Sequence, residues 1–187
     1  MRRLLALLPL LAVSAAPKLG YHYWLDGPHS AVTAKVSYIG FGSKVAHFPQ
    51  MRDSIRLNPT RLDTIGHEVE LDANAMSAGS KSDTAYLRGQ DFFDVGQYPV
   101  VRFAGQRMLM TGPSTARIEG QITTRGMTRP ATLVVTFRDP RARANGRDPI
   151  ALSARTSINR KDFGMTTYPV VVGKTVTISI DARLMPG

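Results

Sequence analysis

Apolar and polar residues alternate with period two along much of this chain. Between residues 31 and 39, Val32, Ala34, Val36 and Tyr38 fall on one face, and small or polar residues fall on the other. Successive side chains of a β-strand point to opposite sides of its sheet, so this pattern predicts a half-buried strand. Similar patterns or strand-like composition predict further strands at 21–26, 55–57, 69–75, 100–104, 115–124, 131–138, 150–158 and 170–184.

These stretches amount to about eight strands separated by turn signals, without a long amphipathic helix after the N-terminal segment. A β-sandwich and a β-barrel are the two architectures that fit such a series. Gly120 and Gly173 lie at or inside strands, where glycine permits the bends by which a sheet closes. Closure also removes exposed sheet edges, which favours the barrel.

One stretch in the middle of the chain breaks the alternation. Leu87, Phe92, Phe93 and Val95 make it too apolar for a solvated loop, yet they do not alternate. We predict a short helical or irregular plug, a helical insertion around residues 84–95, that presses its aromatic rings onto an apolar wall. The small, polar residues 77–84 are expected to form the loop that leads into it.

The N-terminus has the composition of a secretory signal. Arg2 and Arg3 precede the apolar run 4–13, and small residues follow at 14–16. That run is shorter than the roughly 20 residues of a membrane-spanning helix. We expect cleavage after Ala15 and a single β-barrel domain at 16–187, located in the periplasm or secreted. The chain has no cysteine, so its fold cannot depend on disulfides.

The chain is strongly basic, with 24 Lys and Arg against 14 Asp and Glu and a net charge of +10. Loss of Arg2 and Arg3 would leave 22 − 14 = +8, which favours anionic partners. Nucleic acid is not expected, because the basic residues are scattered without stacking aromatics. Arg138, Arg141, Arg143 and Arg147 mark either a solvated loop or a peripheral contact with an anionic membrane surface.

Two groups of residues suggest chemistry. Asp26, His29 and Ser30 could form a hydrolase site, but adjacent strand residues point to opposite faces and no Gly-x-Ser-x-Gly elbow is present. A turn stabilised by hydrogen bonds is the simpler interpretation. The four histidines lack the spacing of a metal site, so neither a metal nor a catalytic residue is expected.

Several inward positions of the predicted strands and plug could line a ligand pore or fill a dry core. Arg160 could contact a ligand headgroup or form a structural turn pair with Asp162. The candidate ligand-binding residues are Val36, Tyr38, Val69, Leu71, Phe92, Phe93, Val101, Phe103, Ile122, Phe163 and Arg160.

Four blocks of the sequence, in order, resemble one known family. They are Tyr23-x-x-Asp26-x-x-His29-Ser30, the segment Leu87-Arg88-Gly89-Gln90-Asp91-Phe92-Phe93-Asp94 with Tyr98-Pro99, the segment 120–133 beginning Gly-Gln-Ile-Thr-Thr-Arg-Gly-Met, and Ile158-Asn159-Arg160-Lys161-Asp162-Phe163-Gly164-Met165. On these blocks the chain resembles the YceI-like proteins, periplasmic lipocalin-like barrels associated with polyisoprenoid binding. The resemblance runs from about residue 21 to residue 184.

The resemblance implies an all-β, antiparallel, eight-stranded lipocalin-like barrel whose apolar pore takes a long-chain amphiphilic lipid. The ligand would be a polyisoprenoid or a quinone-like molecule that is carried or sequestered without catalysis and without a further cofactor. Two other functions stay open: a small exported hydrolase that uses Ser30 and His29 or a carboxylate site, and an envelope stress or accessory protein that acts through a protein partner. The sequence does not decide between a monomer and a homodimer.

Overall fold

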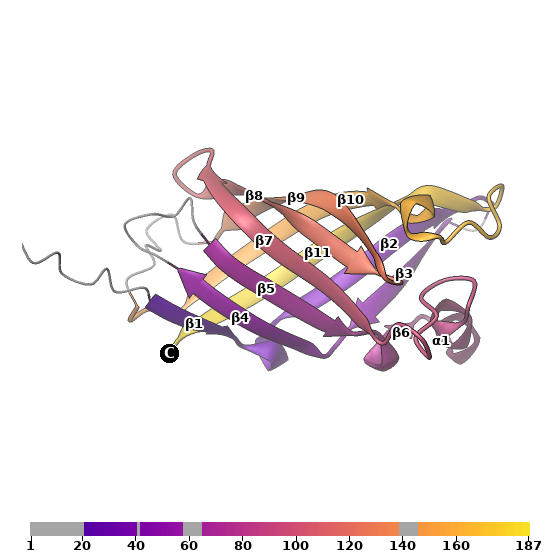
Figure 1. Ribbon diagram of the computed structural model, residues 1–187, viewed down its shortest axis with the longest axis horizontal. Coiled ribbons are helices and arrows are strands. Elements are labelled where there is room, and N and C mark those ends of the chain that lie inside the picture. The colour runs from indigo at the N-terminus through magenta and orange to yellow at the C-terminus, as the bar shows by residue number, and fades with distance from the viewer. Residues whose placement is uncertain (1–20, 41, 58–64, 139–145) are drawn as a thin grey trace, which may run out of the picture.

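The computed structural model describes residues 21–40, 42–57, 65–138 and 146–187 (Figure 1). The predicted signal segment and its cleavage site therefore lie outside the described residues. The described chain forms an antiparallel sheet of eleven strands that curls on itself, with one α-helix and three short 3₁₀ helices. None of the described helices has the length and hydropathy that a membrane-spanning helix requires.

The strands follow the alternating stretches of the sequence. Their bounds are β1 Tyr21–Leu25, β2 Ala31–Tyr38, β3 Gly42–Phe48, β4 Met51–Leu57, β5 Ile65–Asp72, β6 Ser77–Ala78, β7 Val100–Met110, β8 Thr115–Thr124, β9 Met127–Phe137, β10 Ile150–Asn159 and β11 Val172–Pro186. The helices are α1 Lys81–Arg88 and the 3₁₀ helices η1 Gly27–His29, η2 Ala73–Ala75 and η3 Arg160–Phe163.

Eight of these strands close into a ring in the order β1-β4-β5-β7-β8-β9-β10-β11, because β1 also pairs with β11. The remaining strands are continuations of three members of the ring. Helix η1 separates β1 from β2, two residues separate β3 from β4, and η2 separates β5 from β6. The predicted antiparallel eight-stranded barrel is thus confirmed, and the count of eleven arises because three long strands are interrupted.

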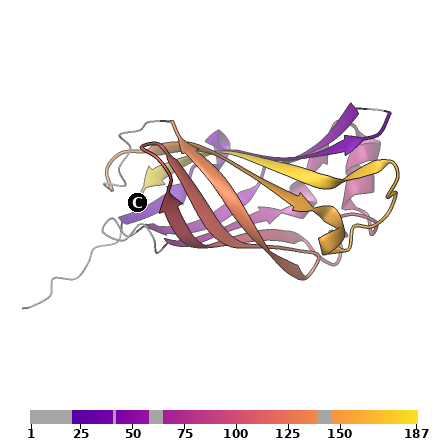
Figure 2. The ribbon, with the colours of Figure 1, turned by 90° about the horizontal axis from the view of Figure 1, so that it is seen from above.

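The two ends of the barrel differ. At one end the ring is closed, whereas at the other β2, β3 and β6 continue beyond it, and β6 pairs with β3 but has no recorded pairing with β7 among the described strands. We call this second end the split end. Helix α1 and the turns of residues 89–99 lie there, together with η3 and the loop that follows it (Figures 1 and 2).

The closed half of the barrel contains a cluster of buried, mostly apolar side chains. Its core consists of Tyr23, Met108, Ala116, Ile118, Leu133, Val135, Ile150, Ala154 and Leu184. Close approach of two strands beside this core requires glycine: a Cβ on Gly120 would collide with the Ala104 carbonyl oxygen and lie 2.9 Å from Gly105 Cα. The register of β7 against β8 shifts beside this pair, between Gly105 and Arg107, as expected at a bend.

Three local predictions are corrected by the structure. Residues 77–84 do not form only a loop, because α1 begins at Lys81, and the Ser80 hydroxyl caps it by accepting a hydrogen bond from Asp83 N–H at 3.0 Å. The helical insertion thus ends at Arg88, and residues 89–99 follow as turns. Residues 73–75 leave the strand for η2, where the Asp72 carboxylate accepts from Asn74 N–H at 2.8 Å.

The connection between the strands predicted at 115–124 and 131–138 is only two residues long. Arg125 and Gly126 both have positive φ, of 50° and 69°, as a tight hairpin turn requires. Pro130 therefore lies inside β9, opposite Gln121 of β8. Recorded pairing of β9 with β10 begins only at Val134, so the missing N–H of Pro130 can face the side without a partner strand.

Candidate functional site

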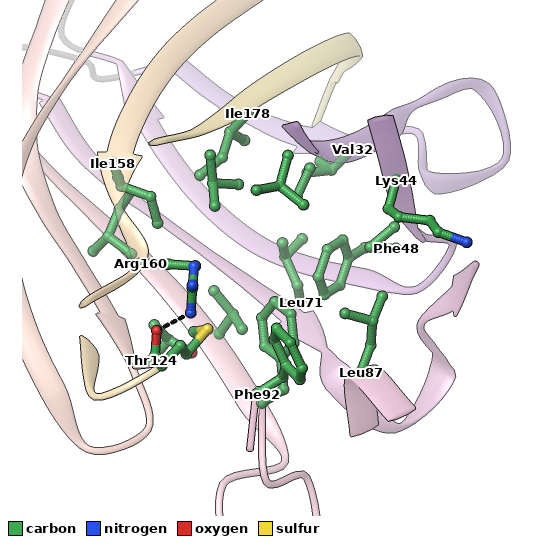
Figure 3. Close-up of a pocket in the computed structure, with 18 of the residues that line it drawn as sticks. Val32, Lys44, Phe48, Leu71, Leu87, Phe92, Thr124, Ile158, Arg160 and Ile178 are labelled. Carbon is green, nitrogen blue, oxygen red and sulfur yellow. Dashed lines mark hydrogen bonds between the residues drawn. The ribbon is translucent and has the colours of Figure 1, made fainter. Parts of the chain in front are cut away.

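An apolar pocket occupies the split half of the barrel (Figure 3). Its empty volume is about 800 Å³ when the part open to solvent is included, and about 90 Å³ can hold the centres of water-sized molecules. Sixteen of the nineteen lining residues are apolar: Val32, Ala34, Val36, Ala46, Phe48, Leu71, Leu87, Phe92, Phe93, Val101, Ile122, Ile158, Met165, Val172, Val176 and Ile178. The three polar ones are Lys44, Thr124 and Arg160.

Strand alternation builds most of this wall. Val32, Ala34 and Val36 of β2 face inward together, and β11 pairs Ile178 with Ala34 and Val176 with Val36. The intervening Lys35 and Ser37 are exposed. A wall of methyl and methylene groups with so little polar surface favours a ligand that is itself mostly hydrocarbon.

The turns of residues 89–99 hold two aromatic rings against this wall. Phe93 N–H donates to the Leu87 carbonyl at 3.0 Å, and the Phe93 ring packs edge-on against Phe48 with centroids 5.7 Å apart. Arg125 fastens the segment from the neighbouring hairpin, since its Nη1 donates to the carbonyl oxygens of Gln90 and Phe92. The predicted plug is therefore real, and it forms one side of the pocket.

Helix α1 forms another side with little apolar support of its own. None of its residues is buried, and Leu87 is its only residue among those that line the pocket (Figure 3). Polar contacts hold it in place: Lys44 Nζ lies 2.9 Å from the Asp83 carboxylate, and Arg88 Nη2 donates to the Met76 carbonyl at 2.6 Å. The hydrogen bond from Lys44 lowers the pKa of Asp83.

Arg160 places a buried positive charge in the pocket wall. It is only 1 % exposed, and its guanidinium donates to four backbone carbonyls. Nε bonds to Gly173 at 3.0 Å, and Nη2 bonds to Val172 at 3.0 Å and to Tyr168 at 3.5 Å, while Nη1 bonds to Met165. Burial lowers the pKa of Arg160, but an arginine stays charged in proteins.

The Arg160 guanidinium has more N–H groups than recorded hydrogen bonds to the described residues. A guanidinium carries five N–H groups, and four hydrogen bonds to protein are recorded. No carboxylate of the described residues forms an ion pair with Arg160. Thr124, whose side chain also lines the pocket, is buried as well. Arg160 and Thr124 are thus polar residues in an otherwise largely apolar wall.

The structure brings seven of the predicted ligand-binding residues together in this pocket: Val36, Leu71, Phe92, Phe93, Val101, Ile122 and Arg160. Four others do not line it. Phe163 is 1 % exposed and forms a buried cluster with Ile122 and Met165. Phe103 packs against both this cluster and the core of the closed half. Tyr38 lies below Lys44, with its ring centroid 5.8 Å from Nζ, and Val69 lies further along β5. Ligand contact by any of these residues stays a prediction.

Sequence reasoning missed twelve of the lining residues. For some, a signal existed, because Val32 and Ala34 share the face of Val36, and Val176 and Ile178 alternate in the same way. Lys44, Thr124 and Met165 carried no such signal, because a polar residue or a residue outside a regular strand does not reveal its direction from periodicity. The others missed are Ala46, Phe48, Leu87, Ile158 and Val172.

The residues considered for hydrolysis are engaged elsewhere. His29 Nδ1 lies 2.9 Å from the Asp26 carboxylate, and the Ser30 hydroxyl accepts a hydrogen bond from Arg183 N–H at 3.0 Å. His29 and Ser30 thus stabilise the turn at η1 and its contact with β11. Within the part of the chain that the structure describes, no cluster of three or more His, Asp or Glu could hold a metal ion.

Comparison with known proteins identifies the group to which this chain is related. The family of YceI-like domains matches residues 23–184. The chain belongs to the YceI-like family. Among its relatives, the UPF0312 protein of Pseudomonas putida strain GB-1 is 25 % identical over 174 residues, which cover 93 % of this chain and 90 % of that protein. The UPF0312 protein of Pseudomonas fluorescens strain SBW25 is 23 % identical over 155 residues, which are 82 % and 81 % of the two chains.

Several solved structures share the fold. Burkholderia cenocepacia BcnA aligns with a TM-score of 0.75 and 20 % identity, over 85 % of this chain and 98 % of that one. The YCEI protein of Campylobacter jejuni gives 0.66 and 17 %, over 74 % and 82 %. A Saccharophagus degradans domain described as polyisoprenoid-binding gives 0.62 and 13 %, over 88 % and 98 %. At these identities the similarity establishes the barrel fold.

Proposed function

We propose that this protein binds an amphiphilic lipid with a long apolar chain, of the isoprenoid or quinone-like class, and carries or sequesters it without catalysis. The observation on which the proposal depends is the pocket in the split half, with its sixteen apolar lining residues. Membership of the YceI-like family and the polyisoprenoid-binding relative from Saccharophagus degradans support it.

The pocket sets the energetics of such binding. Burying ten methylene-sized groups contributes about 8 kcal/mol at about 0.8 kcal/mol each, which corresponds to about micromolar affinity before the cost of ordering the chain. The space free for water-sized molecules is only about 90 Å³. A long chain would therefore fit in the pocket only in part, and the rest of it would displace α1 or extend out of the pocket.

Arg160 gives the ligand a polar end. We infer that the N–H beyond the four bonded to carbonyls would donate to a carbonyl, hydroxyl or acidic oxygen of the bound molecule. Hydrocarbon without oxygen would fill the pocket but leave that donor unpaired, which costs free energy in an apolar site. The proposal therefore favours an amphiphile over a pure hydrocarbon.

A substitution that fills the pocket tests the proposal. Val176→Phe places a ring into the hollow, whereas Val134→Phe adds the same ring on the exposed face of β9, where Val134 is 55 % exposed. Displacing three to four methylene groups of ligand should weaken uptake of a labelled polyprenol by about 50- to 200-fold at about 0.8 kcal/mol each. Val134→Phe should bind as the parent does. Equal uptake by both variants, or none by the parent, would contradict the proposal.

We also propose that the protein is exported. Arg2, Arg3 and the apolar run 4–13 support this. The intact mass of protein recovered from the cell envelope should correspond to a chain that begins at Ala16. Recovery of the uncleaved chain from the cytoplasm would oppose export, and it would leave the pocket proposal unaffected.

A further inference from the structure

Four large apolar side chains are exposed at the split end. They are Ile39, 65 % exposed, at the turn between β2 and β3; Tyr86, 44 %, on α1; and Tyr168 and Val170, 43 % and 77 %, in the loop between η3 and β11. We call these four residues the apolar rim. Single exposed apolar residues are ordinary, but a group of them at one end of a molecule marks an interaction site.

The rim is fixed in place by contacts between its three segments. Ile39 N–H donates to the Val171 carbonyl at 2.9 Å, which joins the β2–β3 turn to the loop. The Tyr86 and Tyr168 rings lie 5.7 Å apart, and their hydrogen bond raises the pKa of Tyr86 to about 12. The Thr167 hydroxyl donates to Asp91 at 3.0 Å and fastens the loop to residues 89–99.

Backbone geometry directs Val170 outward. Tyr168 has φ of 54°, in the left-handed region that residues other than glycine seldom adopt. Its carbonyl accepts from both Val171 N–H at 3.2 Å and Val172 N–H at 2.9 Å, so the chain turns tightly. Val172 then points into the pocket while Val170 projects into solvent. Val170 is thus the most exposed of the four rim residues.

The rim residues are close in the chain to residues that line the pocket. Leu87 follows Tyr86 in the chain, Val172 is two residues from Val170, and both line the pocket. The views of Figures 1 and 2 agree that α1, the β2–β3 turn and the loop after η3 lie at one end of the barrel, away from the C-terminus.

The surroundings of the rim suit an anionic surface. Lys81, Lys161 and Lys174 are exposed and form no ion pair with the described residues. Of the nearby carboxylates, Asp83 is paired with Lys44, whereas Asp91 and Asp162 accept hydrogen bonds from the neutral side chains of Thr167 and Asn159. Lysine stems and tyrosine rings have an apolar body and a polar tip, which suits the boundary between headgroups and acyl chains.

We propose that the apolar rim inserts into the surface of a membrane that contains anionic phospholipid, so that the pocket opens onto the bilayer. The four side chains expose on the order of a few hundred Å² of apolar surface, typical of an interaction patch, whereas a stable protein–protein interface buries at least about 1,200 Å² in total. The pocket would take up its lipid from that membrane, and this part of the inference rests on the proposed function. Insertion itself does not require the pocket to be filled.

Vesicle binding tests the rim. The purified protein is floated with phosphatidylglycerol–phosphatidylcholine vesicles, and the double variant Ile39→Ser/Val170→Ser is compared with Met110→Ser/Val134→Ser. The second pair removes exposed apolar groups, 46 % and 55 % exposed, away from the rim. We expect at least tenfold weaker binding for the rim variant and a change within twofold for the control. Equal binding by the two variants would overturn the proposal.

Insertion is located with a tryptophan probe. Trp24 is the only tryptophan, so Trp24→Phe provides a background for Val170→Trp and, separately, for Met110→Trp near the opposite end. Brominated lipids should quench the probe at residue 170 and not the probe at residue 110. Quenching at residue 110 alone would indicate that the membrane contact lies at the basic loop that includes Arg138. Self-association without vesicle binding would indicate that the rim contacts a second copy of the chain. Either result would overturn the proposal.

Uptake of a labelled polyprenol in vesicle-free solution separates this inference from the proposed function. The rim variant should take up the polyprenol as the parent does, because neither Ile39 nor Val170 lines the pocket. Rim-dependent vesicle binding without any polyprenol uptake would refute the proposed function and leave the membrane contact standing.

Discussion

Replacing Arg160 by methionine tests how the pocket wall is held together. Arg160→Met keeps the length of the side chain but removes the donors to the carbonyls of Met165, Tyr168, Val172 and Gly173. These carbonyls belong to the loop after η3 and to the start of β11, so the guanidinium is the tie between them.

The expected loss of stability in Arg160→Met follows from four hydrogen bonds and one buried charge. Each hydrogen bond contributes about 1 kcal/mol net, and an acceptor left without a partner costs about 1–3 kcal/mol. Water entering from the pocket would rehydrate some carbonyls, and removing a buried charge recovers part of its desolvation cost. We expect Arg160→Met to lower the free energy of unfolding by about 3 kcal/mol, and the melting temperature by about 6–12 °C.

Urea unfolding followed by circular dichroism measures this loss, with Lys161→Met as the control because Lys161 is exposed and adjacent. Arg160→Lys restores the charge but not the planar fork, so it should recover less than half of the lost stability. A change below about 0.5 kcal/mol for Arg160→Met, the size typical of surface substitutions, would refute the structural role. Full recovery by lysine would show that charge alone matters.

Three other substitutions test the fold, the interior and the helix. Gly120→Ala should destabilise the barrel by about 3 kcal/mol, because its Cβ would collide with the Ala104 carbonyl, whereas Gly96→Ala meets nothing within 4 Å and should be neutral in thermal unfolding. Burial lowers the pKa of His67 to about 4, so between pH 6.5 and 4 the unfolded chain binds a proton that the folded chain does not. Acidification from pH 7 to 4.5 should therefore cost about 2 kcal/mol, a loss that His67→Gln removes in urea titrations at the two pH values. Asp83→Asn breaks the pair with Lys44; stability should change by less than about 1 kcal/mol, while polyprenol exchange in stopped-flow should quicken as α1 loosens.

The barrel could be predicted because alternation reports which side of a sheet a residue faces. It does not report how far along the barrel that residue lies. Leu71 and Val69 share the inner face of β5, and Val101 and Phe103 share that of β7, but only Leu71 and Val101 line the pocket. Val69 and Phe103 lie two residues further toward the closed half, where Phe103 packs against the core.

Closure and the polar part of the site depend on contacts between distant segments, which a single sequence does not report. Pairing of β1 with β11 joins residues 23–25 to 184–186. Arg160 is buried where its guanidinium bonds to carbonyls of the loop before β11 and of the start of β11. The capping of α1 by Ser80 had a local signal, Ser-x-x-Asp, but the small polar residues around it favoured a loop in our prediction.

The central claim is that the split half of the barrel holds the chain of an amphiphilic lipid. Mass spectrometry of lipid extracted from protein purified from its own cells tests it most directly, with Val176→Phe purified in parallel. We predict a near-stoichiometric long-chain molecule bearing at least one oxygen in the parent, and its loss in the variant. An extract free of lipid from a parent that also fails to take up added polyprenol would contradict the account.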